Sequence, residues 1–150
     1  MAAKKKKKPI IVYAYVCGDI LHEGHLLQME NGKALGDKLI VGVLTDKAVM
    51  EKKPRPILEF RERLRLIQSL KCVDAAVPQD EYSPLANLKA LNPDIHMESA
   101  SHFGDKYLEK LKKEFKGRIV MTPYYPDQSS TAIKNKIKKY YVPPKKCGCE

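Results

Sequence analysis

Two of the four histidines in this 150-residue chain lie three positions apart, in the stretch D-I-L-H-E-G-H-L-L-Q-M-E that spans residues 19–30. His22 and His25 flank Glu23 and Gly24. Imidazoles at this spacing suit three roles: metal ligands, loop side chains satisfied by backbone groups, or donors to phosphate oxygens. Each role makes a different demand on the rest of the chain.

A zinc site is the first of these interpretations. The motif H-E-G-H is one residue shorter than H-E-x-x-H, the spacing that places two imidazoles on one helical face. A zinc site also needs a third protein ligand. The two other histidines, His96 and His102, remain candidates for that ligand, but no matching signature surrounds them. We therefore predict no protein-held metal.

Phosphate handling is better supported, because donors occur at two expected helix starts near opposite ends of the chain. A helix N-terminus presents free N–H groups and a partial positive charge. At the first start, Gly24 lets a phosphate approach the backbone closely, beside His22 and His25. At the second, S-S-T-A-I-K-N (129–135) offers three hydroxyls followed by a lysine. Together the two starts predict a polyphosphate cradle, provided that they meet in space.

Expected strands and helices alternate along the chain, and their arrangement must bring the two helix starts together. Apolar runs rich in β-branched residues predict strands, and their continuous apolar character suits a parallel sheet covered by helices. The expected strands are 10–16, 39–44, 73–77, 95–97 and 119–122. Helical patterns fill the gaps. The expected helices are 26–35, 59–70, one from Ser83-Pro84 to Asn92-Pro93, 107–115, and a last one from 129 to about 141.

This alternation predicts an α/β fold, a Rossmann-like three-layer α/β/α arrangement with a five-stranded, mainly parallel sheet. Right-handed crossovers then place every strand-to-helix loop along one edge of the sheet. Ligands bind at that edge, near the point where the strand order reverses. Both donor groups lie on loops of this kind. One helix prediction is weakened by Asn31 and Gly32, which occupy the middle of 26–35.

Composition bounds the remaining possibilities. With 43% hydrophobic and 31% charged residues the chain is typical of a globular protein. We expect one domain, residues 10–142, between a basic disordered arm (1–9) and a flexible tail (143–150). The net charge of +10 includes five lysines at 4–8, and the remainder still favours anionic ligands. No signal peptide or membrane-spanning run is visible, so a cytoplasmic protein is expected. The pair Cys147-Gly-Cys149 does not have the C-x-x-C spacing of redox or zinc motifs.

The two donor motifs also resemble those of a known family. Y-x-C-G-D-I-L-H-E-G-H is similar to the first signature of the HxGH nucleotidyltransferases, and S-S-T-A-I-K is similar to their second. Between them, LGDKLIVGVLTDKAV and RERLRLIQSLKCVDAAVP match in order and spacing, so the resemblance covers roughly residues 10 to 140. It is closest to the cytidylyltransferases, including the glycerol-3-phosphate type. Closest of all is the branch that activates 2-aminoethylphosphonate: its GLLTDKAI, VVPQ, LKPD and PYTPGISST correspond here to GVLTDKAV, AVPQ, LNPD and PYYPDQSST.

The resemblance implies an enzyme that transfers CMP from CTP to a small phosphonate or phosphoalcohol and releases pyrophosphate. Such an acceptor is already anionic, so catalysis rests on alignment and on stabilising the charge of the leaving pyrophosphate. The resemblance further implies Mg²⁺ bound with CTP and a homodimeric assembly. It does not imply a membrane span, and it makes a nucleic-acid partner an unfavoured alternative.

The same resemblance assigns roles to individual residues. The catalytic set is His22, His25, Lys47 and Arg63. The nucleotide-binding set is Val16, Cys17, Gly18, Asp19, Gly24, Ser129, Ser130 and Thr131. The substrate-binding set is Lys53, Arg55, Glu98 and Ser99. No protein ligand to a metal is assigned.

The chain departs from the phosphonate branch after the fourth strand. There the branch carries HGDDW, whereas this chain reads ESASHF at 98–103, with Ala100 and Ser101 in place of two acids. If those acids hold a substrate ammonium, their loss favours a hydroxyl or carbonyl acceptor such as 2-hydroxyethylphosphonate. Glu98 could still receive an amine. Before the last helix, Asp127-Gln128 replaces Gly-Ile, and Tyr124-Tyr125 stands where some relatives have an arginine.

Two alternatives stay open. Within the superfamily, adenylyl transfer from ATP uses the same two signatures, and base-reading contacts are not visible in the sequence. In a different class, a basic nucleic-acid-binding module would explain the lysine arm at 4–8, but it would not explain the pairing of H-E-G-H with S-S-T-A-I-K.

Overall fold

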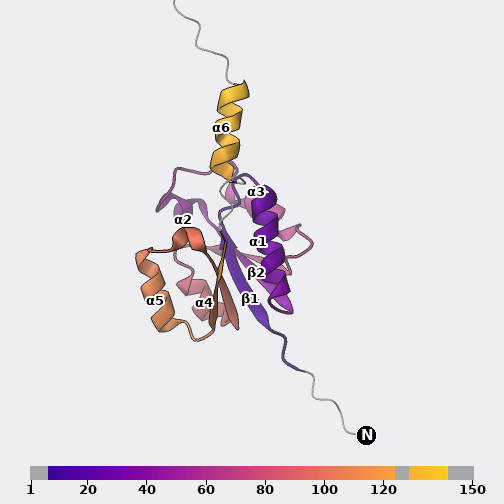
Figure 1. The fold of residues 1–150 in the computed structure, drawn as a ribbon, viewed down its shortest axis with the longest axis vertical. Helices are drawn as coiled ribbons and strands as arrows, with labels where there is room; N and C mark the ends of the chain where they lie inside the picture. Colours follow the sequence, from indigo (N-terminus) through magenta and orange to yellow (C-terminus); the bar gives the residue numbers. More distant parts are fainter. Residues whose placement is uncertain (1–6, 124–128, 142–150) are drawn as a thin grey trace, which may run out of the picture.

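The structure, a computed structural model, describes residues 7–123 and 129–141. These residues form one sheet with the strand order β3-β2-β1-β4-β5, in which every neighbouring pair is parallel (Figure 1). The strands are β1 (Ile11–Val16), β2 (Lys38–Leu44), β3 (Ala75–Gln79), β4 (Ile95–Ser99) and β5 (Arg118–Thr122). The predicted α/β class with a five-stranded parallel sheet is confirmed.

Helices connect the strands and cover the sheet. They are α1 (Glu23–Ala34), α2 (Asp46–Met50), α3 (Phe60–Gln68), α4 (Leu85–Leu91), the short 3₁₀ helix η1 (Ala100–His102), α5 (Lys106–Glu114) and α6 (Ser130–Tyr141). Helices α1 and α3 lie on one side of the sheet, and α4 and α5 lie on the other (Figure 1). Helix α6 extends from the edge where β1 ends and buries none of its residues.

Strand β1 builds the core on both faces, because successive side chains of a strand point in opposite directions. Val12, Ala14 and Val16 belong to the cluster beneath α1 and α3. Tyr13 and Tyr15 belong to the cluster beneath α2, α4 and α5. The continuous apolar run that predicted a central strand is therefore explained by burial on both sides.

The order of the strands places a ligand site at the end of β1. From β1 the chain moves outward through β2 and β3, and then crosses back to β4 on the other side of β1. The loops after β1 and β4 leave in opposite directions, and the crevice between them is the point where a parallel sheet binds its ligands. This is the edge on which the two donor motifs were expected.

Helix α1 begins at Glu23, three residues earlier than predicted, so His22 is its N-cap and His25 lies in its first turn. The mid-helix Gly32 has a packing reason: a Cβ there would lie 3.0 Å from Leu39 Cδ1 and 3.2 Å from Met97 Cε. A side chain there would require the Leu39 and Met97 side chains to shift by a few tenths of an ångström. The glycine that weakened the prediction lets α1 approach closely.

The start of β3 and the short helix α2 also differ from expectation. Strand β3 starts at Ala75 rather than at residue 73, because the Val73 N–H donates to Leu70 in a turn and ladder pairing with β2 begins only at Ala75. Helix α2 was not predicted: it has only five residues, and Thr45 caps it by accepting the Ala48 N–H at 3.3 Å.

Among the described residues, no helix combines the length and the apolar character that a membrane crossing requires. Several sequence predictions fall outside the described part of the chain. They are those on residues 1–6 of the basic arm, Tyr124-Tyr125, Asp127-Gln128, and the tail with Cys147 and Cys149.

Candidate active site

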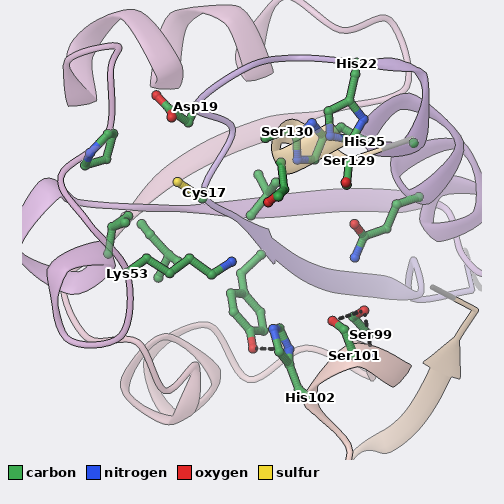
Figure 2. A pocket seen from close by; sticks show the side chains of 18 of the residues that line it. Cys17, Asp19, His22, His25, Lys53, Ser99, Ser101, His102, Ser129 and Ser130 are labelled. Carbon is green, nitrogen blue, oxygen red and sulfur yellow. Dashed lines mark hydrogen bonds between the residues drawn. The ribbon is translucent and has the colours of Figure 1, made fainter. Parts of the chain in front are cut away.

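A cavity of about 520 Å³ opens at the carboxyl ends of β1 and β4. Four segments supply most of its walls: the β1–α1 loop with the start of α1, the loop after α2, the end of β4 with η1, and the start of α6 (Figure 2). Most of the predicted site residues line it. They are Val16, Cys17, Asp19, His22, Gly24, His25, Lys53, Ser99, Ser129, Ser130 and Thr131. Of the others, Gly18 shapes the first loop with a left-handed φ of 70°.

The two histidines of the first motif lie against each other at the start of α1. Their ring centroids are 3.8 Å apart with an interplanar angle of 24°. The Nδ1 atom of each is buried and lacks a hydrogen-bond partner within the described structure. Buried polar atoms are normally satisfied, so this pair is prepared for a partner that the protein itself does not supply.

Both imidazoles are held in their neutral form. Burial lowers the pKa of His22, and burial together with the nearby His22 and Lys53 charges lowers the pKa of His25 to about 4. Near neutral pH each ring therefore carries one N–H donor and one acceptor. Through that N–H a neutral imidazole can donate one hydrogen bond to a phosphate oxygen.

The second motif forms the start of α6. Ser129 acts as its N-cap, since its Oγ accepts the Ala132 N–H at 3.2 Å and its carbonyl accepts the Ile133 N–H. Its hydroxyl proton remains available, because a hydroxyl can accept and donate at once. Ser130 Oγ lies 3.4 Å from the carbonyl of Ile20, in the β1–α1 loop. The hydroxyls of the second motif and the imidazoles of the first thus border the same cavity (Figure 2).

An ion pair joins these two segments. Lys134 Nζ lies 2.7 Å from Asp19 Oδ2, across 115 positions of sequence. The other Asp19 oxygen accepts the backbone N–H groups of Ile57 and Leu58 at 2.6 and 3.0 Å. Burial acts to raise the pKa of Asp19, but the hydrogen bonds from Lys134, Leu58 and Ile57 outweigh it, so the pKa is lowered. Asp19 therefore fixes three walls of the cavity to one another.

Lys53 reaches the cavity from the loop between α2 and α3. Asp19 holds one end of this loop at Ile57 and Leu58. At the other end Lys52 pairs with Asp105 at 2.9 Å and lies 4.5 Å from the Tyr82 ring centroid. Between these anchors the Lys53 amine points into the cavity (Figure 2). An anionic ligand in the cavity would therefore contact the Lys53 amine, which is carried by a loop held at both ends.

Arg63 does not reach the cavity, contrary to its assignment to the catalytic set. Its side chain is fully buried. Its Nη1 donates to the carbonyls of Cys17 and Leu44 at 2.6 and 2.7 Å, its Nε donates to Leu58, and its Nη2 pairs with Asp46. The guanidinium already donates to groups of the protein itself. It therefore stabilises the loop after β1 and does not contact a ligand.

Glu98 is likewise turned away from the cavity, although it was assigned to substrate binding. It is fully buried, and its two oxygens contact His96 Nε2 at 3.1 Å and His102 Nδ1 at 2.6 Å. The other two predicted residues that do not line the cavity, Lys47 and Arg55, are exposed. Successive side chains of a strand point in opposite directions. Because Ser99 faces the cavity, the neighbouring Glu98 points away from it.

The structure adds lining residues that the sequence did not single out as ligand contacts. They are Tyr15, Gln28, Tyr82, Ser101 and His102. Tyr15 could have been found, because it is the next-to-last residue of the strand that precedes the first loop. His102 was considered only as a zinc ligand. Among the described residues, no three His, Cys, Asp or Glu side chains are placed to hold a metal ion together.

Comparisons with known proteins relate this chain to one family. A sequence profile described as cytidylyltransferase-like matches residues 16–136. The bifunctional protein HldE of Helicobacter acinonychis (strain Sheeba) is 38% identical over 136 residues, which cover 89% of this chain and 29% of that protein. HldE of Streptomyces coelicolor is 36% identical, covering 82% of this chain and 27% of the relative. The chain thus spans less than a third of the length of these relatives.

Solved structures show the same fold. The lipopolysaccharide core biosynthesis protein from Thermoplasma volcanium GSS1 is 31% identical with a TM-score of 0.71, over 79% of this chain and 99% of that one. A pantoate-beta-alanine ligase from Francisella tularensis, complexed with beta-gamma ATP and beta-alanine, is 16% identical with a TM-score of 0.61. It covers 88% of this chain and 67% of its own. At that identity the second likeness concerns the fold alone.

Proposed function

The chain belongs to the cytidylyltransferase-like family and is therefore a nucleotidyltransferase, and we propose that it transfers CMP from CTP to a small phosphonate or phosphoalcohol. The observation that carries the proposal is the convergence of two distant segments on one cavity. His22 and His25 come from the start of α1, and Ser129 to Thr131 come from the start of α6. Imidazole, hydroxyl and helix N-termini are all suited to phosphate oxygens.

In the proposed reaction an acceptor oxygen attacks the α-phosphorus of the nucleotide. The bond from the α-phosphorus to the bridging oxygen breaks, and pyrophosphate leaves with that electron pair. The attacking oxygen is already ionised, so no strong base is needed. His22 and His25 donate to oxygens on which charge grows, and the hydroxyls of Ser129 to Thr131 hold the departing phosphates. This is stabilisation by prearranged donors.

Lys53 is the described lysine best placed to bind the acceptor anion, since its amine enters the cavity from the wall formed by the loop after α2 (Figure 2). We propose that Mg²⁺ arrives with the nucleotide. The described residues offer no cage of carboxylates, and the one acid in the lining, Asp19, already uses both oxygens. That donor set fits an ion held mainly by triphosphate oxygens and water. When bound, the ion supplies positive charge against the leaving pyrophosphate.

A sugar-phosphate acceptor is the second candidate. It is favoured by the 31% identical structure, whose name places it in lipopolysaccharide core biosynthesis. None of the relatives described above carries a phosphonate name, so the phosphonate acceptor is supported by the sequence resemblance alone. The donor also remains to be tested, because adenylyl transfer is the alternative within the superfamily.

A pyrophosphate-release assay separates these possibilities. The purified protein is mixed with each of the four ribonucleoside triphosphates and a panel of acceptors: 2-hydroxyethylphosphonate, 2-aminoethylphosphonate, glycerol 3-phosphate and hexose 1-phosphates. We expect CTP with a phosphonate or phosphoalcohol to give the highest rate. A preference for ATP with a hexose phosphate would support the second candidate with adenylyl transfer.

The nucleic-acid-binding alternative is tested in the same assay with residues 1–9 removed. We expect unchanged pyrophosphate release. If no triphosphate and acceptor combination released pyrophosphate, while the full chain bound nucleic acid and the shortened chain did not, the proposed function would be wrong.

A further inference from the structure

The wall opposite the two stacked histidines is made of uncharged hydrogen-bonding side chains. Figure 2 shows Ser99, Ser101 and His102 on the far side of the cavity from His22 and His25. Ser99 Oγ lies 2.8 Å from Ser101 Oγ and also accepts the Ser101 N–H at 3.2 Å. Ser99, the N-cap of η1, and Ser101 within η1 therefore hold their hydroxyls next to each other.

A buried carboxylate orients the imidazole of this wall. Glu98 Oε1 is 2.6 Å from His102 Nδ1 and also receives the Tyr15 hydroxyl and the Ser99 N–H, each at 3.1 Å. Its other oxygen contacts His96 Nε2 at 3.1 Å. Burial acts to raise the pKa of Glu98, but the hydrogen bonds with His102 and His96 outweigh it and lower the pKa to about 2.

An ionised carboxylate only accepts hydrogen bonds, so the proton of His102 lies on Nδ1. Nε2 is then the accepting nitrogen of a ring that lines the cavity, and its partner is the Tyr82 hydroxyl at 3.3 Å, which a ligand hydroxyl would have to replace. A ligand hydroxyl can donate to such a nitrogen and accept from a serine at the same time. The wall is complementary to an oxygen that both donates and accepts.

This wall offers no free carboxylate to an ammonium group. Asp19 is the only acid among the described lining residues, and both of its oxygens are already used by Lys134 and by the N–H groups of Ile57 and Leu58. Glu98 is fully buried behind the wall. Lys53, whose amine enters the cavity, would repel a second positive charge. A charge moved out of water without a partner is strongly disfavoured.

We propose that Ser99, Ser101 and His102 form a subsite for an uncharged, hydroxyl-bearing part of a ligand, with His102 determining selectivity and Glu98 positioning its ring. The inference rests on the proposed function, because the ligand is one of the two substrates of that reaction. The hydroxyl comes either from the acceptor or from the ribose of the nucleotide. Either source meets the same donors and acceptors.

The test measures kcat/KM for matched substrate pairs in the full-length protein. The first arm compares acceptors that differ only in a hydroxyl or an amine: 2-hydroxyethylphosphonate with 2-aminoethylphosphonate, and glucose 1-phosphate with glucosamine 1-phosphate. The second arm compares the preferred triphosphate with its 2′-deoxy and 3′-deoxy forms. We expect the hydroxyl form to be preferred about tenfold or more in at least one arm, because a site built to bind a hydroxyl rejects an analogue without it.

The variant His102→Ala should remove that preference, mainly through KM, and leave the other arm unchanged. The arm that responds identifies the source of the hydroxyl. His102→Gln should restore part of the preference, because an amide can still accept and donate. Glu98→Gln should reduce the preference with little change in kcat. If the Glu98 variant fails to fold, Ser101→Ala tests the same subsite at an exposed position, and it should also reduce the hydroxyl preference.

The matched control is Phe103→Ala. Phe103 follows His102 directly, is 83% exposed and does not line the cavity, so its loss should change neither preference. The inference is overturned if the amine is preferred, or if neither arm shows a hydroxyl preference. It is also overturned if His102→Ala and Ser101→Ala leave both preferences intact. Absence of pyrophosphate release with every acceptor would instead reject the proposed function, and this inference with it.

Discussion

Asp19 and Lys134, 115 positions apart in the sequence, form an ion pair with 2.7 Å between carboxylate and amine. The pair joins the loop after β1 to the start of α6, and the same carboxylate holds the loop that carries Lys53. Each of these segments is short and has little core of its own. Their relative position therefore depends on a few polar contacts at the rim of the cavity.

The first prediction concerns this pair. Asp19→Asn keeps the size of the side chain but removes the charge that attracts Lys134, and it weakens the acceptor for Ile57 and Leu58. We expect pyrophosphate release to fall about 10- to 100-fold, because misplaced substrate-binding groups carry a penalty of that order. A matched control is Lys33→Met, which breaks the equally short Lys33–Asp74 pair at a distance from the cavity. Equal losses in both variants would show that the position of the Asp19 pair has no special importance.

The second prediction concerns Arg63, which braces the carbonyls of Cys17 and Leu44 and pairs with Asp46. Arg63→Ala leaves these buried acceptors and the Asp46 charge without a partner. We expect a loss of about 3 kcal/mol in the free energy of unfolding, measured by urea denaturation. Arg63→Lys should not restore stability, because an ammonium cannot reproduce the planar fork. A stable Arg63→Ala variant whose only defect was a raised KM for the triphosphate would instead place Arg63 on the ligand.

The third prediction concerns pH. The pKa of His25 is lowered to about 4, chiefly by burial, from an ordinary value of 6.5. The unfolded chain therefore binds a proton at His25 over a range in which the folded chain does not. This contribution favours the folded state above pH 6.5 and is lost progressively as the pH falls toward 4. We expect the melting temperature to drop across this window, and His25→Gln to drop less. An identical pH dependence in the two proteins would contradict the assignment.

The fourth prediction concerns packing in the centre of the sheet. A Cβ at Gly42 would lie 1.9 Å from the Tyr13 hydroxyl, which is itself bonded to Gln79 and Asn87 in the core. Gly42→Ala should cost about 3 kcal/mol or more in the free energy of unfolding, since the neighbours cannot move away freely. The control Gly104→Ala faces open space, and only its φ of 94° opposes a side chain. We expect the control to cost about 1–2 kcal/mol. A smaller effect at Gly42 than at Gly104 would contradict this packing.

The sequence predicted the frame of the molecule because its strands are apolar on both faces. Tyr13 and Ala14 point to opposite sides of β1 and are both fully buried, which only a sheet covered on both faces allows. The two donor motifs could be placed at one edge by topology alone. The missed helix α2 has too few residues for a periodic pattern to be visible, and the early start of α1 was hidden by its glycines.

The direction of individual charged side chains could not be predicted. Arg63 and Glu98 were expected to meet ligands because of the family resemblance. Both have partners supplied by distant parts of the chain: Arg63 reaches the carbonyl of Cys17, and Glu98 reaches His102. Such pairings depend on the packing of helices against the sheet, which no local pattern encodes. The same holds for His102, whose position in the cavity wall follows from the 3₁₀ turn after β4.

The most direct test is a crystal structure of the protein with its preferred triphosphate bound. The account predicts that one nucleotide spans the cavity. A nitrogen of His22 or His25 and the hydroxyls of Ser129 to Thr131 should lie within about 3.2 Å of its phosphate oxygens. A triphosphate bound elsewhere, or one that touches only one of the two helix starts, would contradict the claim that both ends of the chain build a single phosphate site.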